Sequence, residues 1–171
     1  RQILKGGLRL PGDESGDAYL FTQRLAAMAA EKGVSFRFRT EIEAIEAASD
    51  AIYGIRTSAG RLTADAYVLA LGSYSPRLLK PIELDLPVYP VKGYSLTAPI
   101  TDESRVPTST VNDETYKVAM TRLGDRIRIG GTAELTGWRL KLSQDRRETL
   151  ELSFNDMFGG ADLSRARYWT G

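Results

Sequence analysis

The segment Pro90–Tyr94 and the turn at Gly72 carry the residue types best suited to bind a ligand. In Pro90–Tyr94 a rigid proline precedes Lys92, Gly93 and Tyr94, so a cation and a hydroxyl could meet a small anionic ligand. Gly72 ends an apolar run, and a glycine at such a bend lets a ligand approach the backbone closely. Each also has an ordinary interpretation, as a proline-bounded strand start and as a tight turn after a buried strand.

Other polar groups are weaker candidates. The acidic stretch 13–17 could do acid–base work or hold a hard cation, but a solvated loop followed by a helix cap at Asp17 explains it. Arg37, Arg39 and Arg56 could form a basic stripe, although the wet face of a half-buried sheet explains them as well. The two consecutive glycines Gly130 and Gly131 indicate either the close approach of another group to the backbone or a simple β-bulge.

The composition narrows the chemistry available. The chain of 171 residues has neither cysteine nor histidine, which excludes thiolate nucleophiles, Cys-type metal sites and the commonest general base. Its 23 basic and 22 acidic side chains give a net charge of +1, so no long-range field attracts nucleic acid. No G-x-G occurs, so the dinucleotide fingerprint is absent. Catalysis would need other polar side chains or a bound cofactor.

The first half of the chain predicts one helix and a series of strands. Apolar residues recur at helical spacing over 17–32, with Asp17 as the cap and Gly33 as the stop. Residues 34–40 alternate apolar and charged, which indicates a half-buried strand, and the meander continues to residue 64. The continuous apolar run 65–71 is typical of a strand covered on both faces, and a short helix follows to about Lys80.

The second half predicts strands at 88–99, 115–122 and 126–132, with a hairpin turn at 123–125. Ser143 is expected to cap a helix over 143–158 that ends at two glycines, and residues 165–171 are expected to be extended. Residues 3–10 indicate short strands. The fold class is therefore α+β, with a mixed or antiparallel sheet and two main helices. No apolar run approaches the length of a membrane span, and both ends look like those of an internal piece of a longer chain.

Five strings in a fixed order carry a resemblance to a known family. They are Gly7–Tyr19, Tyr67–Ser75, Leu86–Ser95, Asp125–Glu134 and Tyr168–Gly171. Together they resemble the D-amino-acid oxidase/glycine oxidase group of FAD-dependent oxidoreductases, and within it the small subunits of bacterial D-amino-acid dehydrogenases. The resemblance implies that the glycine fingerprint for the FAD pyrophosphate and an arginine that grips the substrate carboxylate lie outside this piece.

The resemblance also implies a domain division. Residues 1–80 would belong to the FAD-binding domain, with the helix 17–32, the meander 34–64 and the buried strand 65–71, while residues 1–11 are a candidate extra strand of the substrate-domain sheet. Residues 81–155 would form the substrate-binding domain, and 156–171 would return towards the FAD domain. Leu71 stands where the family usually has threonine. The implied FAD-binding residues are Ile42, Ala70, Leu71, Gly72, Lys92 and Gly93, and the implied substrate-binding residues are Tyr94 and Tyr116.

The implied activity is oxidative deamination of a D-amino acid, D-alanine being the expected substrate, to a 2-oxo acid and ammonia by hydride transfer to FAD. The implied electron acceptor is the membrane quinone pool. The implied location is the cytoplasm or the cytoplasmic face of the inner membrane, with peripheral membrane association of the whole enzyme. No nucleic-acid partner or metal is expected, and the piece alone is expected to be inactive. The alternatives are a glycine- or sarcosine-type FAD oxidase and a non-catalytic binding module.

Overall fold

The computed structural model describes residues 4–171, and its chain divides into two units. The large unit comprises the described part of Arg1–Arg24 together with Val91–Gly171, and the small unit is Leu25–Pro90. Helix α1 (Ala18–Glu31) belongs in part to each. The observed folding is mixed α and β with antiparallel pairing throughout, as the sequence predicts.

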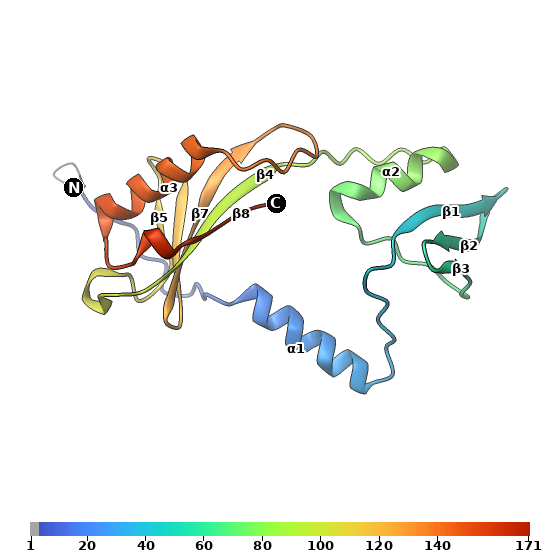
Figure 1. Cartoon of the computed structure of the whole chain (residues 1–171), viewed down its shortest axis with the longest axis horizontal. Helices are drawn as coiled ribbons and strands as arrows, with labels where there is room; N and C mark the ends of the chain where they lie inside the picture. The colour runs from blue at the N-terminus through green and yellow to red at the C-terminus, as the bar shows by residue number, and fades with distance from the viewer. Residues whose placement is uncertain (1–3) are drawn as a thin grey trace. The chain divides into compact units, whose positions relative to one another are not determined.

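The large unit is built on a five-stranded antiparallel sheet with the order β5-β6-β7-β4-β8 (Figure 1). Helix α3 (Gln144–Met157) packs against β4, β6 and β7, and short 3₁₀ turns occur at Glu103–Arg105 and Leu163–Arg165. The strand bounds are Lys92–Pro99 for β4, Val111–Asp113 for β5, Val118–Leu123 for β6, Arg126–Glu134 for β7 and Arg167–Thr170 for β8.

Alternation along the strands supplies the core of the large unit. Leu96 and Ala98 on β4 and Ile127 and Ile129 on β7 are completely buried, since every second side chain of a strand points to the same face. Helix α3 contributes Leu150 and Phe154, which lie four residues apart and so share one helix face. The core cluster as a whole contains Tyr94, Leu96, Ala98, Val106, Val118, Met120, Ile127, Ile129, Leu150 and Phe154.

The opposite face of this sheet carries the alternate residues, and we call it the open face. Arg128 lies between Ile127 and Ile129 on β7 and is exposed. The register pairs Arg128 with Thr97 on β4 and with Thr121 on β6. One row further along, Ser95 of β4 lies between Trp169 of β8 and Gly130 of β7.

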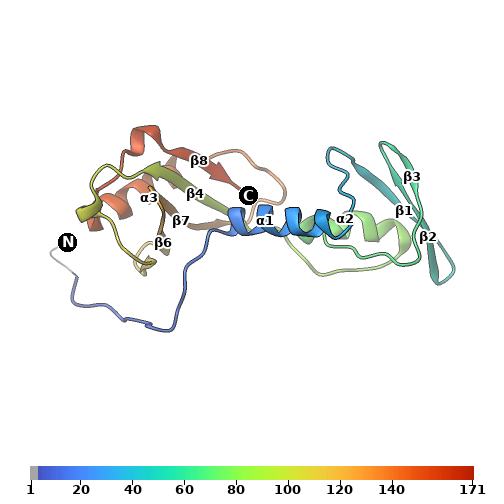
Figure 2. The ribbon, with the colours of Figure 1, turned by 90° about the horizontal axis from the view of Figure 1, so that it is seen from below.

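The small unit contains a three-stranded antiparallel sheet and a short helix (Figure 2). Its strands are β1 (Ile42–Ala48), β2 (Ala51–Thr57) and β3 (Gly60–Leu62). Helix α2 (Ser75–Leu79) packs against β1 and lies between 3₁₀ turns at Gly72–Tyr74 and Lys80–Ile82.

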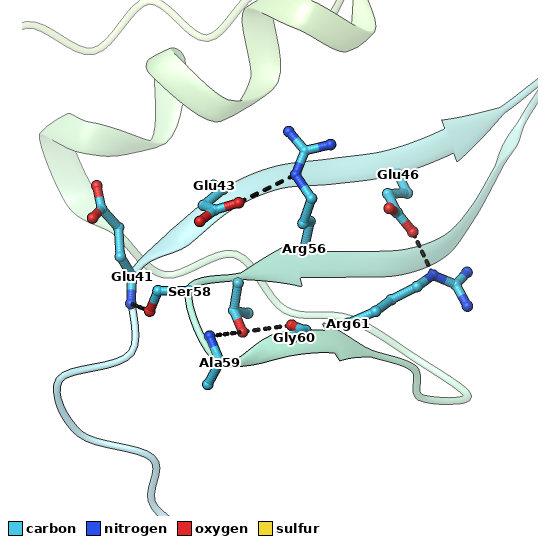
Figure 3. Close-up of polar contacts among 9 residues, drawn as sticks. Glu41, Glu43, Glu46, Arg56, Ser58, Ala59, Gly60 and Arg61 are labelled. Atoms are coloured by element: carbon cyan, nitrogen blue, oxygen red, sulfur yellow. Dashed lines mark hydrogen bonds and ion pairs between the residues drawn. The ribbon is translucent and has the colours of Figure 1, made fainter.

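Cross-strand ion pairs line the three-stranded sheet. Arg56 Nε lies 3.2 Å from Glu43 Oε2, and Arg61 Nε lies 2.5 Å from Glu46 Oε2 (Figure 3). The hydrogen bond from Arg61 to Glu46 raises the pKa of the guanidinium. Arg56 therefore has a carboxylate partner, while Arg37 and Arg39 lie outside any strand, so the predicted basic stripe does not form.

The two predicted main helices are confirmed. The Oδ1 atom of Asp17 accepts a hydrogen bond from the N–H of Leu20 at 3.0 Å, and Gly33 ends α1 with φ at +91°. Helix α3 spans nearly the predicted range, but the Ser143 side chain makes no capping hydrogen bond. The carbonyl of Ser143 instead accepts a bond from the Tyr168 hydroxyl at 2.6 Å.

Three predicted strands are wrong. Residues 34–40 form a loop, in which Phe38 is 80% exposed and Arg39 has a φ of +55°. Residues 65–71 form no strand either, and Val68, which was expected to be buried, is 92% exposed. Residues 4–11 pair with nothing in either sheet, and residues 1–3 lie outside the described part. The physical reason is common to all three: a strand needs a hydrogen-bonded neighbour, and no strand lies beside these segments among the described residues.

No helix in residues 4–171 has the length and apolar character required to cross a bilayer.

Candidate functional site

Lys92, Tyr94 and Glu134 form a polar cluster at one end of the five-stranded sheet, which we call the ion-pair cluster. Lys92 Nζ lies 2.8 Å from Glu134 Oε2, and the Tyr94 hydroxyl donates to the same oxygen at 2.5 Å. Lys92 Nζ also donates to the carbonyl of Lys141 at 2.9 Å and lies 4.9 Å from the centre of the Tyr94 ring. Lys92 is 5% exposed and Tyr94 2%, so both side chains are committed to this cluster.

Strand register brings the cluster together. Lys92, the first residue of β4, is paired with Glu134, the last residue of β7. A bulge lies between Gly93 and Tyr94, and opposite it Thr132 adopts a φ of +60°. Gly131 beside it has no space for a side chain, because a Cβ there would lie 2.4 Å from the carbonyl oxygen of Lys117. The buried Oγ1 of Thr132 has no hydrogen-bond partner among the described residues.

Lys92 and Glu134 of the cluster are both charged at neutral pH. The hydrogen bonds from Lys92 and from Tyr94 lower the pKa of the Glu134 carboxyl, and the bond to Glu134 raises the pKa of the Lys92 ammonium. Tyr168 stacks on Tyr94 with ring centres 5.9 Å apart, and burial raises the pKa of its hydroxyl. The ion pair therefore joins the first residue of β4 to the last residue of β7.

Gly93 offers a ligand a bare Cα. Its N–H donates to the Gly171 carbonyl at 2.8 Å, and its own carbonyl accepts from the Thr170 hydroxyl at 2.8 Å. A side chain added at Gly93 would meet its nearest atom, the Gly171 oxygen, only at 3.9 Å. The backbone is therefore fully bonded while the space above it stays open.

Tyr116 lies at the same end of the sheet as the ion-pair cluster. It occupies the turn between β5 and β6, two residues before Val118, and packs partly buried against the core. Val118 pairs with Gly131, which pairs in turn with Tyr94. The structure thus gathers the four predicted residues of the large unit, Lys92, Gly93, Tyr94 and Tyr116, at one sheet end.

The remaining predicted site residues lie together in the small unit. Ile42 is at the start of β1 and is partly exposed, and the backbone of the preceding Glu41 is fixed by two hydrogen bonds to Ser58 (Figure 3). Ala70 and Leu71 are exposed, and Gly72 has a φ of +53° with no atom within 4 Å of its Cβ position. The helix that follows Gly72 packs on β1, so both segments belong to one local structure.

Sequence reasoning missed Glu134, the residue that organises the cluster. It lies far from Lys92 along the chain, and only the β4–β7 register makes them neighbours. In the acidic stretch 13–17, Asp17 caps α1, and no group of three or more His, Cys, Asp or Glu side chains among residues 4–171 is arranged to hold a metal ion. Two shallow hollows, one along α3 at 145–152 and one at 76–85, are lined by none of the sequence-predicted site residues.

Comparison with known proteins gives a consistent result. A family model described as FAD-dependent oxidoreductase matches residues 1–171. A protein named D-amino acid dehydrogenase from Methylobacterium sp. (strain 4-46) is 60% identical over all of this chain, which covers 41% of that protein. A protein of the same name from Granulibacter bethesdensis is 60% identical over 98% of the chain and 40% of its own length. The chain thus spans about two fifths of the length of the curated relatives it matches.

Solved structures show the same fold. Glycine oxidase from Bacillus cereus has a TM-score of 0.72 at 24% identity, covering 88% of this chain and 41% of that one. L-proline dehydrogenase from P. horikoshii has a TM-score of 0.74 at 17% identity, covering 90% of this chain and 42% of that one.

Proposed function

The chain belongs to the family of FAD-dependent oxidoreductases, and from this premise we propose that it is part of an enzyme that oxidatively deaminates D-amino acids. The products would be a 2-oxo acid and ammonia, and D-alanine is the substrate we expect. The observation that carries this proposal is the 60% identity, over the whole chain, to proteins named D-amino acid dehydrogenase. The whole enzyme's activity, substrate and partners are all part of the proposal, since the chain spans about two fifths of those proteins.

The small unit has features that fit a role in holding FAD. Gly72 combines a left-handed backbone with empty space at its Cβ position, which is what a ligand that approaches the main chain requires. Ile42 and the exposed Ala70 and Leu71 would meet the adenosine part through their backbone. Leu71 brings no hydroxyl, so that contact would rest on the main chain alone. When bound, FAD supplies the acceptor for the two electrons and the hydride.

The large unit would supply the support for the substrate. The ammonium of Lys92 and the hydroxyl of Tyr94 are both bound to Glu134, so we propose that they act by holding the sheet end in shape. Gly93 would present its bare Cα to the cofactor, and Tyr116 would face the substrate. Such a site needs neither histidine nor cysteine, because the task of the residues at this sheet end would be to orient the substrate and to exclude water.

The electron acceptor we propose is the membrane quinone pool, reached by peripheral association of the full-length enzyme with the cytoplasmic face of the inner membrane. An acceptor other than oxygen would distinguish this enzyme from the glycine oxidases that share its fold.

The test uses the purified full-length flavoprotein. Addition of D-alanine without oxygen should bleach the flavin absorbance, and L-alanine should leave it unchanged. In air, a dehydrogenase should release little peroxide, whereas a soluble quinone analogue should restore turnover. Absence of bleaching by every D-amino acid would overturn the proposal, and rapid peroxide release with glycine would favour a glycine oxidase.

A further inference from the structure

We propose that Arg128 is an anion-binding residue of the open face and receives a carboxylate of the amino-acid substrate. The identity of the ligand rests on the proposed function, while the site itself rests on the geometry of the large unit. The arginine that the family resemblance places beyond Gly171 would be a separate cation, so Arg128 would be an additional determinant of substrate binding.

The position of Arg128 is fixed by its strand. Ile127 and Ile129 on either side are completely buried, so Arg128 must project onto the open face. There its Nη2 donates to Ser95 Oγ at 3.2 Å, and its guanidinium carbon lies 5.9 Å from the centre of the Trp169 ring. The hydroxyl and the indole orient the guanidinium from two sides, and neither cancels its charge.

Arg126, two residues earlier on the same strand and also exposed, shows what a structural arginine looks like here. Its guanidinium lies 3.6 Å from Asp17 Oδ2 and 3.7 Å from Asp125 Oδ1. No carboxylate in residues 4–171 lies within 4.0 Å of Arg128. The two arginines therefore share strand and face but differ in whether their charge is already paired.

The surroundings of Arg128 suit a small carboxylic acid. A guanidinium has five N–H donors arranged in a planar fork that matches the two oxygens of a carboxylate, and Ser95 uses only one of them. Trp169 is 49% exposed and offers an apolar wall for a short carbon chain. Gly130, two residues along β7 on the same face, has no side chain that could cover the guanidinium.

The test measures carboxylate binding separately from turnover. Propionate, which has a short carbon chain and a carboxylate but no amine, is titrated into the full-length flavoprotein and followed by tryptophan fluorescence and by the flavin spectrum. Arg128→Gln should weaken propionate binding about tenfold or more, the scale of one lost charge-assisted pair. Arg126→Gln is the matched control and should change it less than about twofold, since that charge is already compensated.

Turnover then identifies which carboxylate is bound. A raised KM for D-alanine in Arg128→Gln would indicate the α-carboxylate, and a raised KM for D-glutamate alone would indicate the side-chain carboxylate. If Arg128→Gln fails to fold, Arg128→Lys and Ser95→Ala replace it, and both should weaken binding by a smaller factor. Unchanged propionate binding in all three, or no binding to the wild type, would overturn the inference. Arg128-dependent propionate binding without oxidation of any D-amino acid would uphold this site and overturn the proposed function.

Discussion

The large and small units differ in how much of their apolar surface they bury. Among the described residues, Ile45 is the only buried hydrophobic side chain of the small unit, while the large unit contains the whole core cluster. The large unit has a five-stranded sheet with a helix packed on it, and the small unit has three strands and one short helix. The large unit therefore has a complete hydrophobic core, and the small unit does not.

The small unit leaves several apolar segments exposed to solvent. Phe38 and Val68 are among the most exposed large apolar residues of the described chain. Soluble proteins rarely leave such contiguous apolar segments uncovered. Since the relatives are more than twice as long as this chain, we infer that other parts of the full-length protein cover these segments. A completed core and an incomplete one should respond differently to the same kind of substitution.

The largest expected effect is on the core of the large unit. Phe154→Ala should reduce the free energy of unfolding by about 3–5 kcal/mol, because it removes a completely buried ring and leaves a cavity. The matched control is Phe38→Ala, which should change it by less than about 0.5 kcal/mol because that ring is exposed. Urea unfolding of the 171-residue chain is followed by far-UV circular dichroism, which reports on both units, because both tryptophans lie in the large unit. Equal losses for the two variants would show that the small unit has a core as complete as that of the large one.

The ion-pair cluster should give the next largest effect, as a dependence of stability on pH. The pKa of Glu134 is lowered in the folded state, so its contribution is present above the ordinary value of 4.5 and is lost as pH falls through the lower, folded value. The pKa of Lys92 is raised, so its contribution is present below 10.5 and is lost as pH rises through the higher, folded value. The difference in melting temperature between wild type and Glu134→Gln should therefore be largest near neutral pH and shrink towards pH 3.

Glu114→Gln is the control for that experiment. Glu114 pairs with Lys117 through a short contact in which both side chains are exposed, so its loss should leave the melting curve nearly unchanged at every pH. A constant gap between wild type and Glu134→Gln across the whole pH range would contradict the ionised cluster.

The two units also differ in how far sequence predicts them. The helices at Ala18–Glu31 and Gln144–Met157 and the hairpin of β6 and β7 match their expectations, because spacing, caps and turns are local signals. The expected strands at 34–40 and 65–71 are wrong. An apolar pattern indicates which side chains would be buried in a complete fold, but it does not show whether a neighbouring strand is present to pair with the segment. Both of these errors in the small unit concern a segment that has no partner strand.

The candidate site shows the same limit. Lys92, Gly93 and Tyr94 were identifiable as residues with useful chemistry, but their ordinary role as strand start and core residues depends on a pairing with Glu134. Arg126 and Arg128 occupy alternate positions of the same strand, and the sequence alone does not show that the distant Asp17 lies beside Arg126. Long-range register and charge pairing therefore determine which polar residue remains available to a ligand.

A third effect separates the isolated chain from the full-length protein. Amides of residues 65–71 form no strand here, so they should exchange with solvent nearly unprotected in hydrogen-exchange measurements on the 171-residue chain. In the full-length protein the same amides should be strongly protected, and Val68→Ala should cost about 1 kcal/mol there and almost nothing in the chain alone. Amides 127–129 of β7 are the internal reference, since they should be protected in both. Rapid exchange of 65–71 in the full-length protein would contradict the inferred covering of this segment.

The smallest effect concerns α1, the helix that belongs in part to each unit. No residue of α1 is buried, so its stability within the chain depends on local interactions, chiefly the hydrogen bond from Leu20 N–H to Asp17 Oδ1. Asp17→Ala should therefore cost about 1 kcal/mol of helix stability and lower the helical circular-dichroism signal. Asp17→Asn keeps a capping oxygen but loses the charge that faces Arg126, so it should retain most of the signal. If both variants lose the same amount of helix, the contact with Arg126 rather than the cap stabilises α1, and the large unit extends its order into this helix.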